Sequence, residues 1–143
     1  MRRSWVAVAA LAFVASGACG NGGSGGAVTI ALSEHEIVAA PTSAEAGEIT
    51  FNVENSGAET HEFVVVSTDL APDDLPAAED GSFDEEQIEI VDEIEDMESG
   101  ASEELIVDLG AGSYILACNV VEEEDGETEA HYAHGMHTAF EVT

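Results

Sequence analysis

The sequence predicts an all-β protein, built as an antiparallel β-sandwich of about seven or eight short strands. Three observations support this fold class. Apolar and polar residues alternate with a period of two, β-branched residues form short runs, and turn signals separate these segments. At 143 residues with 45% hydrophobic side chains, the chain has material for one core and one domain.

The expected strands can be placed along the chain from these signals. Alternation puts one apolar face on each of the first two strands, at Val28, Ile30 and Leu32 and at Ile49, Phe51 and Val53. Further strands are expected at 61–66, 105–109, 114–118 and 139–142. Turns are expected at 45–48, 55–57, 99–100 and 110–112.

An acidic insertion at about 67–100 interrupts this rhythm. Pro72 and Pro76 predict a loop in its first part. Residues 84–97 fit a helix face or a strand, and the pattern favours a short helical turn near 84–88 followed by a strand over about 89–96.

The charge balance excludes two classes of function. The chain has 31 acidic residues and two basic ones, Arg2 and Arg3, for a formal charge of −29. Nucleic-acid binding needs Lys or Arg to neutralise phosphates, and attraction to an anionic membrane needs a basic patch. Neither partner is expected.

The N-terminus has the pattern of an export signal. Residues 1–18 contain a basic start, an apolar run too short to span a bilayer, and small residues before Cys19. This pattern resembles the lipobox of lipoproteins, although Ser16 stands where Leu is usual, and an ordinary secreted protein is the alternative. Residues 19–26 form a Gly-rich tether, and 27–143 form the folded domain. The expected location is outside the cytoplasmic membrane, held to it by a lipid on Cys19 alone.

Candidate metal ligands gather at His61, Cys118 and the segment 131–137. After export, Cys118 has no partner except Cys19 on the flexible leader, so a metal ion is the expected protector of this thiol. Two imidazoles, a thiolate and a thioether form the donor set that suits copper in electron-transfer sites. The donors are expected at strand ends and in the loop before the last strand.

The sequence here resembles the cupredoxin family, in particular plastocyanin-like and sulfocyanin-like members, over roughly 27–143. Three motifs carry the resemblance: Asn55-Ser56-Gly57 before His61-Glu62-Phe63-Val64-Val65, then Gly112-Ser113-Tyr114 leading to Cys118-Asn119, and His131-Tyr132 with Gly135-Met136 before Phe140-Glu141-Val142. The resemblance implies a Greek-key sandwich that binds one copper ion. It implies the ligands His61, Cys118, His131 and Met136.

One departure from the family pattern follows Cys118. Val121 replaces a common Pro, and the acidic segment 122–130 lengthens the spacing, so that twelve residues separate Cys118 from His131. We expect this segment to loop into solvent, because unpaired carboxylates are not buried.

Several alternatives stay open for individual residues. His134 or His137 could replace His131 or contact a second ion, and Met136 could be a packing residue. His35 is expected to be a surface or packing residue. The acidic residues lack the alternating pattern of a calcium loop and are expected to form a solvated surface.

The favoured function is that of a membrane-tethered blue-copper electron carrier, acting as a monomer with redox proteins of an exported chain. A copper storage or delivery protein and a metal-free interaction sandwich are the alternatives. Catalysis is not expected, because the motifs provide neither a second copper centre nor an open coordination site. The acidity favours adaptation to high salt over a docking face for a basic partner.

Overall fold

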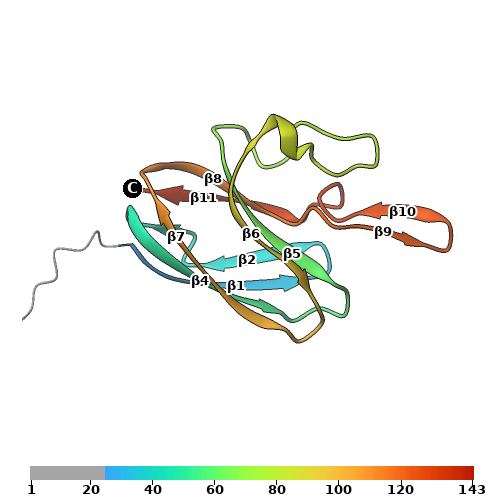
Figure 1. The fold of residues 1–143 in the computed structure, drawn as a ribbon, viewed down its shortest axis with the longest axis horizontal. Coiled ribbons are helices and arrows are strands. Elements are labelled where there is room, and N and C mark those ends of the chain that lie inside the picture. Colours follow the sequence, from blue (N-terminus) through green and yellow to red (C-terminus); the bar gives the residue numbers. More distant parts are fainter. Residues whose placement is uncertain (1–24) are drawn as a thin grey trace, which may run out of the picture.

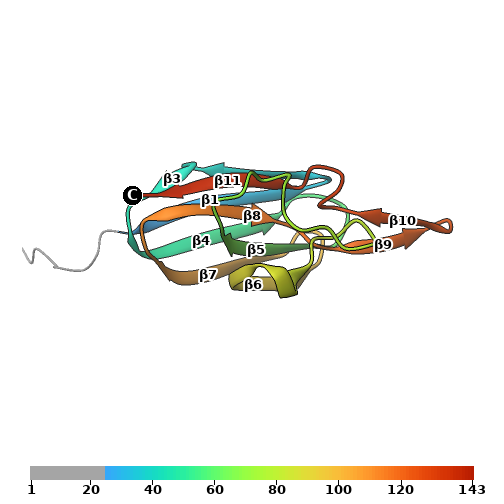
Figure 2. The same ribbon diagram turned by 90° about the horizontal axis from the view of Figure 1, so that it is seen from above.

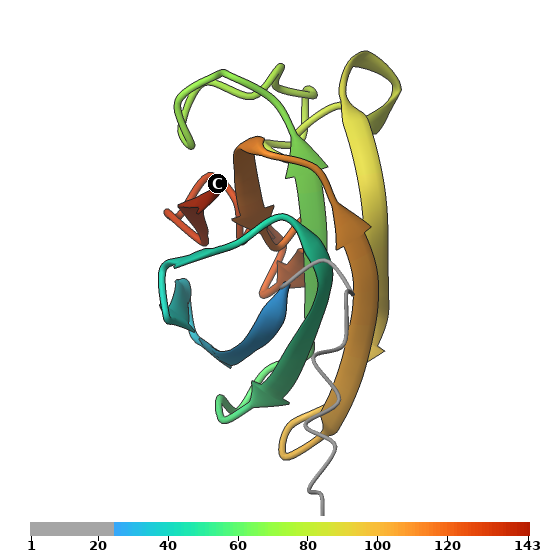
Figure 3. The same cartoon turned by 90° about the vertical axis from the view of Figure 1, so that its left-hand side faces the viewer.

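Two β-sheets packed face to face form the fold, which the computed structural model describes for residues 25–143 (Figures 1 and 3). One sheet has the strand order β2-β1-β4-β7 and the other β3-β11-β8-β5-β6, while β9 and β10 pair with each other. The elements are β1 Gly26–Ser33, β2 Glu36–Ala40, β3 Ser43–Ala44, β4 Gly47–Asn55, β5 His61–Ser67, the 3-10 helix η1 Glu85–Gln87, β6 Glu89–Met97, β7 Ser102–Leu109, β8 Gly112–Ala117, β9 Val121–Glu124, β10 Glu127–Ala130 and β11 His137–Val142.

The predicted all-β sandwich is confirmed, with two corrections. The described part has eleven strands, because β2, β3, β9 and β10 were not predicted. The sandwich is also not purely antiparallel, since β1 pairs in parallel with β4 and β11 pairs in parallel with β3. Such pairing depends on where the chain crosses between sheets, which strand-by-strand alternation does not determine.

The main core lies between the two sheets. Val28, Ile30 and Leu32 of β1 are fully buried, as are the alternating apolar residues of β4 that the sequence indicated. Phe51 packs near Phe63 and Phe140, with ring centroids 5.3 and 5.5 Å apart, and so joins the two layers. This core holds the strand ends that carry the candidate ligands.

The segment 67–100 has the predicted form and a structural role that the sequence did not reveal. Its loop carries Pro72 and Pro76, η1 supplies the short helical turn, and β6 follows as the expected strand. Leu75 and Phe83 form a second apolar cluster on the outer face of β5 and β8. This cover explains why β5 is buried on both faces.

The hairpin of β9 and β10 projects from one end of the sandwich, and the C-terminus lies at the opposite end (Figures 1 and 2). Gly25 and Thr143 both bond to Ala46 through backbone hydrogen bonds, so the start of the described chain shares the C-terminal end. The expectations for the signal at 1–18, Cys19 and most of the tether lie outside the described residues. In residues 25–143 no helix has the length and apolar character needed to cross a membrane.

Candidate metal centre

The turn after β4 places His61 at the start of β5, and hydrogen bonds of Asn55 hold this turn. The buried amide of Asn55 donates to the carbonyl oxygens of Glu59 and Met97 at 2.7 and 2.8 Å, and its Oδ1 accepts from the Gly57 N–H at 3.0 Å. A Cβ at Gly57 would lie 2.5 Å from Glu34 Oε1 and 3.1 Å from His61 Nε2, so both side chains would have to shift. His61 is fully buried.

Cys118 follows β8 and is fully buried at the end of the core. Its N–H donates to the Met136 carbonyl at 3.1 Å, and its Sγ accepts from the Glu62 N–H at 3.4 Å. Burial raises the pKa of the Cys118 thiol to about 11, although nearby backbone N–H groups oppose the shift. A metal ion that binds this sulfur at neutral pH therefore displaces a proton.

The short loop before β11 supplies His131 and Met136. The Met136 N–H donates to the His131 carbonyl at 3.1 Å, and Gly135 turns the chain at φ +100°, which glycine adopts without strain. Met136 is fully buried in the same apolar cluster as Cys118. The loop thus holds a thioether and an imidazole close to the thiol through its own backbone bonds.

Three donor atoms converge from these elements. His61 Nδ1 lies 3.1 Å from His131 Nδ1, and Cys118 Sγ lies 3.6 Å from His131 Nδ1. The three residues form a fully buried group whose donor atoms lie within 4.8 Å of one another. Burial and the neighbouring His131 lower the pKa of His61 to about 4, so its imidazole is neutral at pH 7, the form that binds metals.

The outer nitrogens of both imidazoles face carboxylates. His61 Nε2 lies 3.9 Å from Glu34 Oε1, and His131 Nε2 lies 3.6 Å from Glu59 Oε2 and 3.8 Å from Glu122 Oε2. Neither Nε2 has a hydrogen-bond partner within the described residues. These distances are too long for hydrogen bonds, so the carboxylates are neighbours of the imidazoles and do not fix their orientation.

The loop that covers β5 is tied to the same centre. Tyr132, next to His131, donates its hydroxyl to the Pro72 carbonyl at 2.8 Å and accepts from the Leu75 N–H at 3.1 Å. Asn119, next to Cys118, exchanges hydrogen bonds with the backbone of Phe83 at 2.8 and 3.0 Å. These bonds link the insertion to both ligand-bearing segments, a link that the sequence did not reveal.

The structure gives His134 and His137 different neighbours. His137 begins β11, and its ring packs on Tyr132 with centroids 5.0 Å apart. His134 is exposed and stacks on His35 with centroids 4.7 Å apart, close to Glu129. Secondary metal contacts by these two histidines stay a prediction. The approach of His35 and Glu129 to this loop was not predicted from the sequence.

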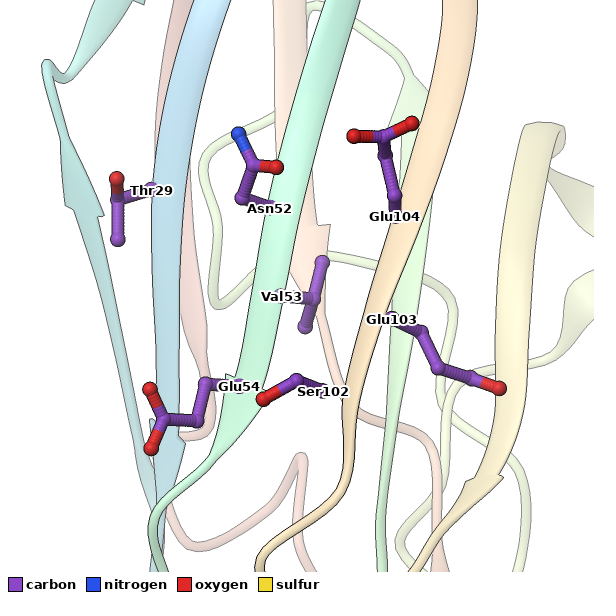
Figure 4. A pocket seen from close by; sticks show the side chains of 7 residues that line it. All are labelled: Thr29, Asn52, Val53, Glu54, Ser102, Glu103 and Glu104. Atoms are coloured by element: carbon purple, nitrogen blue, oxygen red, sulfur yellow. The ribbon is translucent and has the colours of Figure 1, made fainter.

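A hollow lies on the outer face of β1, β4 and β7, away from the candidate ligands (Figure 4). Thr29, Asn52, Glu54 and Glu104 line it with hydroxyl, amide and carboxylate groups. It contains no histidine or cysteine, so it offers no soft metal donors.

Comparisons with known proteins establish the fold. No protein-family model matches the chain, and no curated protein matches it significantly. Among solved structures, a dithionite-reduced auracyanin from Roseiflexus castenholzii has a TM-score of 0.56 and 22% identity, covering 85% of this chain and 99% of its own. Auracyanin B has a TM-score of 0.56 and 17% identity over 84% of this chain and 90% of its own. Auracyanin A, described as a "blue" copper protein from Chloroflexus aurantiacus, has a TM-score of 0.51 and 19% identity over 82% of this chain and 99% of its own. The chain therefore has the auracyanin fold, and the resemblance to cupredoxins is confirmed at the level of the fold.

Proposed function

We propose that the protein is a type 1 copper protein that carries electrons, with His61, Cys118, His131 and Met136 as its ligands. The observation that carries this proposal is the buried group of His61, Cys118 and His131, whose donor atoms come within 4.8 Å of one another. Two imidazoles and one thiolate with a thioether nearby form the donor set of blue-copper sites. Auracyanin A, which shares the fold, is described as a "blue" copper protein.

The chain's own residues fit the requirements of electron transfer. Bound copper would alternate between Cu(I) and Cu(II) and so accept and release one electron. The sandwich keeps the donors in place, because Cys118 and Met136 are joined by a backbone hydrogen bond and His61 begins a strand of the core. Burial of all four side chains excludes water from the donors. A rigid, dry site needs little rearrangement when its charge changes.

We further propose that Cys19 is lipidated and that the domain works outside the cytoplasmic membrane. The described chain starts at the end of the sandwich opposite the β9–β10 hairpin (Figure 1). An anchor before Gly25 would therefore leave the end near the hairpin free to meet redox proteins. On this proposal the protein acts as a monomeric carrier and not as an enzyme.

Copper storage or delivery is the second candidate, and the depth of the donors argues against it. His61, Cys118 and His131 are all fully buried, so an acceptor protein cannot reach the donors without opening the loop before β11. The exposed His134 favours delivery, since it could receive an ion from solvent.

Visible absorption after addition of Cu(II) tests the proposal. We expect an intense blue or green band from charge transfer between the thiolate and copper, which ascorbate bleaches and an oxidant restores. A colourless copper complex would exclude the electron-carrier function. Rapid loss of Cu(I) to a chelator that competes only for accessible metal would support delivery instead.

A further inference from the structure

A second group of metal-binding side chains lies beside the buried centre. His35 occupies the turn between β1 and β2 at φ 58°, Glu129 lies on β10, and His134 lies in the loop before β11. One donor atom from each of the three comes within 4.8 Å of the others. Three separate segments of the chain thus meet at one point.

The geometry of this group brings both imidazoles to one carboxylate. His35 Nε2 lies 2.9 Å from Glu129 Oε1, and His134 Nε2 lies 3.9 Å from the same oxygen. The two rings are stacked, with their planes 22° apart and their centroids 4.7 Å apart. His35 Nε2 is buried and has no hydrogen-bond partner within the described residues, although Glu129 lies at bonding distance. The contact is therefore an ion-pair distance without hydrogen-bond geometry, and the imidazole nitrogen and the carboxylate oxygen face the same small space.

The surroundings add negative charge and an open side. Glu59 and His131 form a second group with His35, in which one donor atom of each residue also lies within 4.8 Å of the others. A hollow lined by Glu124, Asp125, Glu127, Thr128, Glu129 and His134 gives solvent access. Carboxylates around this opening attract cations, and water from the hollow can complete a coordination shell.

We propose that His35, Glu129 and His134 form a second metal site that binds a divalent ion of the zinc class. Two imidazoles and one carboxylate suit zinc, with one or two waters as the remaining ligands. Calcium and magnesium prefer oxygen ligands, and Cu(I) prefers sulfur, so neither class fits this donor set as well. The site consists of residues outside the buried group and does not depend on copper.

A consequence for the neighbouring centre rests on the proposed function. The His35 ring lies 5.6 Å from the His131 ring, so an ion held by His35 adds positive charge close to a proposed copper ligand. Positive charge stabilises the reduced state of copper, which carries less charge of its own. Zinc should therefore shift the reduction potential of the copper-loaded protein upward.

The test measures zinc binding to the full chain in a Cys118→Ala variant, which removes the thiolate of the buried centre. Equilibrium dialysis with metal analysis in molar sodium chloride and excess magnesium suppresses binding to carboxylates alone. We expect one zinc ion per chain, lost in the additional variants His134→Gln or Glu129→Gln. The matched controls His137→Gln, at the start of β11, and Glu123→Gln, on the same hairpin but outside the hollow, should retain it.

Two results would overturn the second site. One is the absence of zinc binding in Cys118→Ala that is folded by circular dichroism, and the other is binding that His134→Gln and Glu129→Gln do not weaken. If Cys118→Ala fails to fold, zinc is added to the copper-loaded wild type, where His134→Gln should again remove one equivalent. Failure of copper to give a blue band would reject the proposed function and leave the zinc result standing.

Discussion

The two histidine clusters are neighbours, because the His35 ring of one lies 5.6 Å from the His131 ring of the other. Their donor atoms nevertheless differ. The inner cluster, His61, Cys118 and His131, is fully buried and contains sulfur. The outer cluster, His35, Glu129 and His134, is half-buried to exposed and contains a carboxylate. Burial selects the donors, because a thiol can lie in an apolar core while an ionised carboxylate must stay near solvent. Similar imidazoles can therefore serve a soft, dry site and a wet one.

The clusters also differ in how the chain holds them. The inner donors lie at strand ends of the sandwich core and are tied together by backbone hydrogen bonds. The outer donors lie on a turn, a projecting hairpin and an exposed loop position. Substitutions in the inner cluster should therefore disturb the fixed geometry of the proposed copper ligands. Substitutions in the outer cluster should affect only the binding of the second ion.

Replacing Cys118 with Ser should have the largest effect. The visible band should disappear completely, because the charge transfer that produces it requires the thiolate. The variant should still fold, and burial of the serine hydroxyl should lower the free energy of unfolding by about 1–3 kcal/mol. Absorption and circular dichroism together check this expectation, and a retained blue band would remove Cys118 from the ligand set.

Replacing single histidines separates the two clusters. His131→Ala should abolish or strongly alter the copper band, since its Nδ1 lies 3.1 Å from that of His61. His134→Ala and His137→Ala should leave the band nearly intact. Absorption and electron paramagnetic resonance of the three copper-loaded variants provide the comparison. A loss of the band in His134→Ala alone would mean that the ligand assignment in this loop is wrong.

Salt should stabilise the whole domain, because its surface is almost uniformly acidic. No carboxylate in residues 25–143 is fully buried, although Glu62 is partly so, and no Lys or Arg follows Arg3. Like charges a few ångströms apart cost about 1 kcal/mol per pair in water, and molar salt shortens the Debye length to about 3 Å. Relief of a few such pairs should raise the melting temperature by about 10 °C.

Thermal unfolding between low and molar sodium or potassium chloride measures this effect. A matched series in sucrose controls for general stabilisation by excluded cosolutes. A melting temperature that does not change with salt would count against salt adaptation and favour a docking role for the acidic surface.

Glu62 should produce a smaller effect that depends on pH. Burial raises the pKa of this carboxyl to about 7, despite the hydrogen bond from the Asn119 N–H at 2.8 Å. Between about pH 4.5 and 7 the folded chain keeps a proton that the unfolded chain has released. The free energy of unfolding therefore falls as pH rises through this window.

Denaturant unfolding of the metal-free protein at several pH values measures this slope. Glu62→Gln keeps an oxygen that can accept from Asn119 and has no proton to release, so its slope should be smaller. The exposed Glu98→Gln serves as the control and should behave like the wild type. Equal slopes in Glu62→Gln and the wild type would show that another group causes the dependence.

The acidic segment 122–130 shows where the sequence was only partly informative. Its exposure is confirmed, because carboxylates stay solvated whatever the backbone does. The hairpin was missed, although Asp125-Gly126 is a strong turn signal, with φ of 53° and 84° in the structure. A run of glutamates has low β propensity, and here pairing across a tight turn outweighs it.

Local sequence patterns predicted the all-β class, the core-facing residues of β1 and β4 and the short helical turn before β6, while His61, Cys118 and His131 were implied as ligands by the family resemblance. These follow from local alternation and from motifs placed at strand ends, which each segment carries within its own residues. The parallel pairing of β1 with β4, the cover over β5, the meeting of the three inner donors and the approach of His35 to Glu129 and His134 became evident in the folded structure. Those contacts join residues far apart in the chain, and their geometry depends on how the sheets twist and on where the hairpin projects.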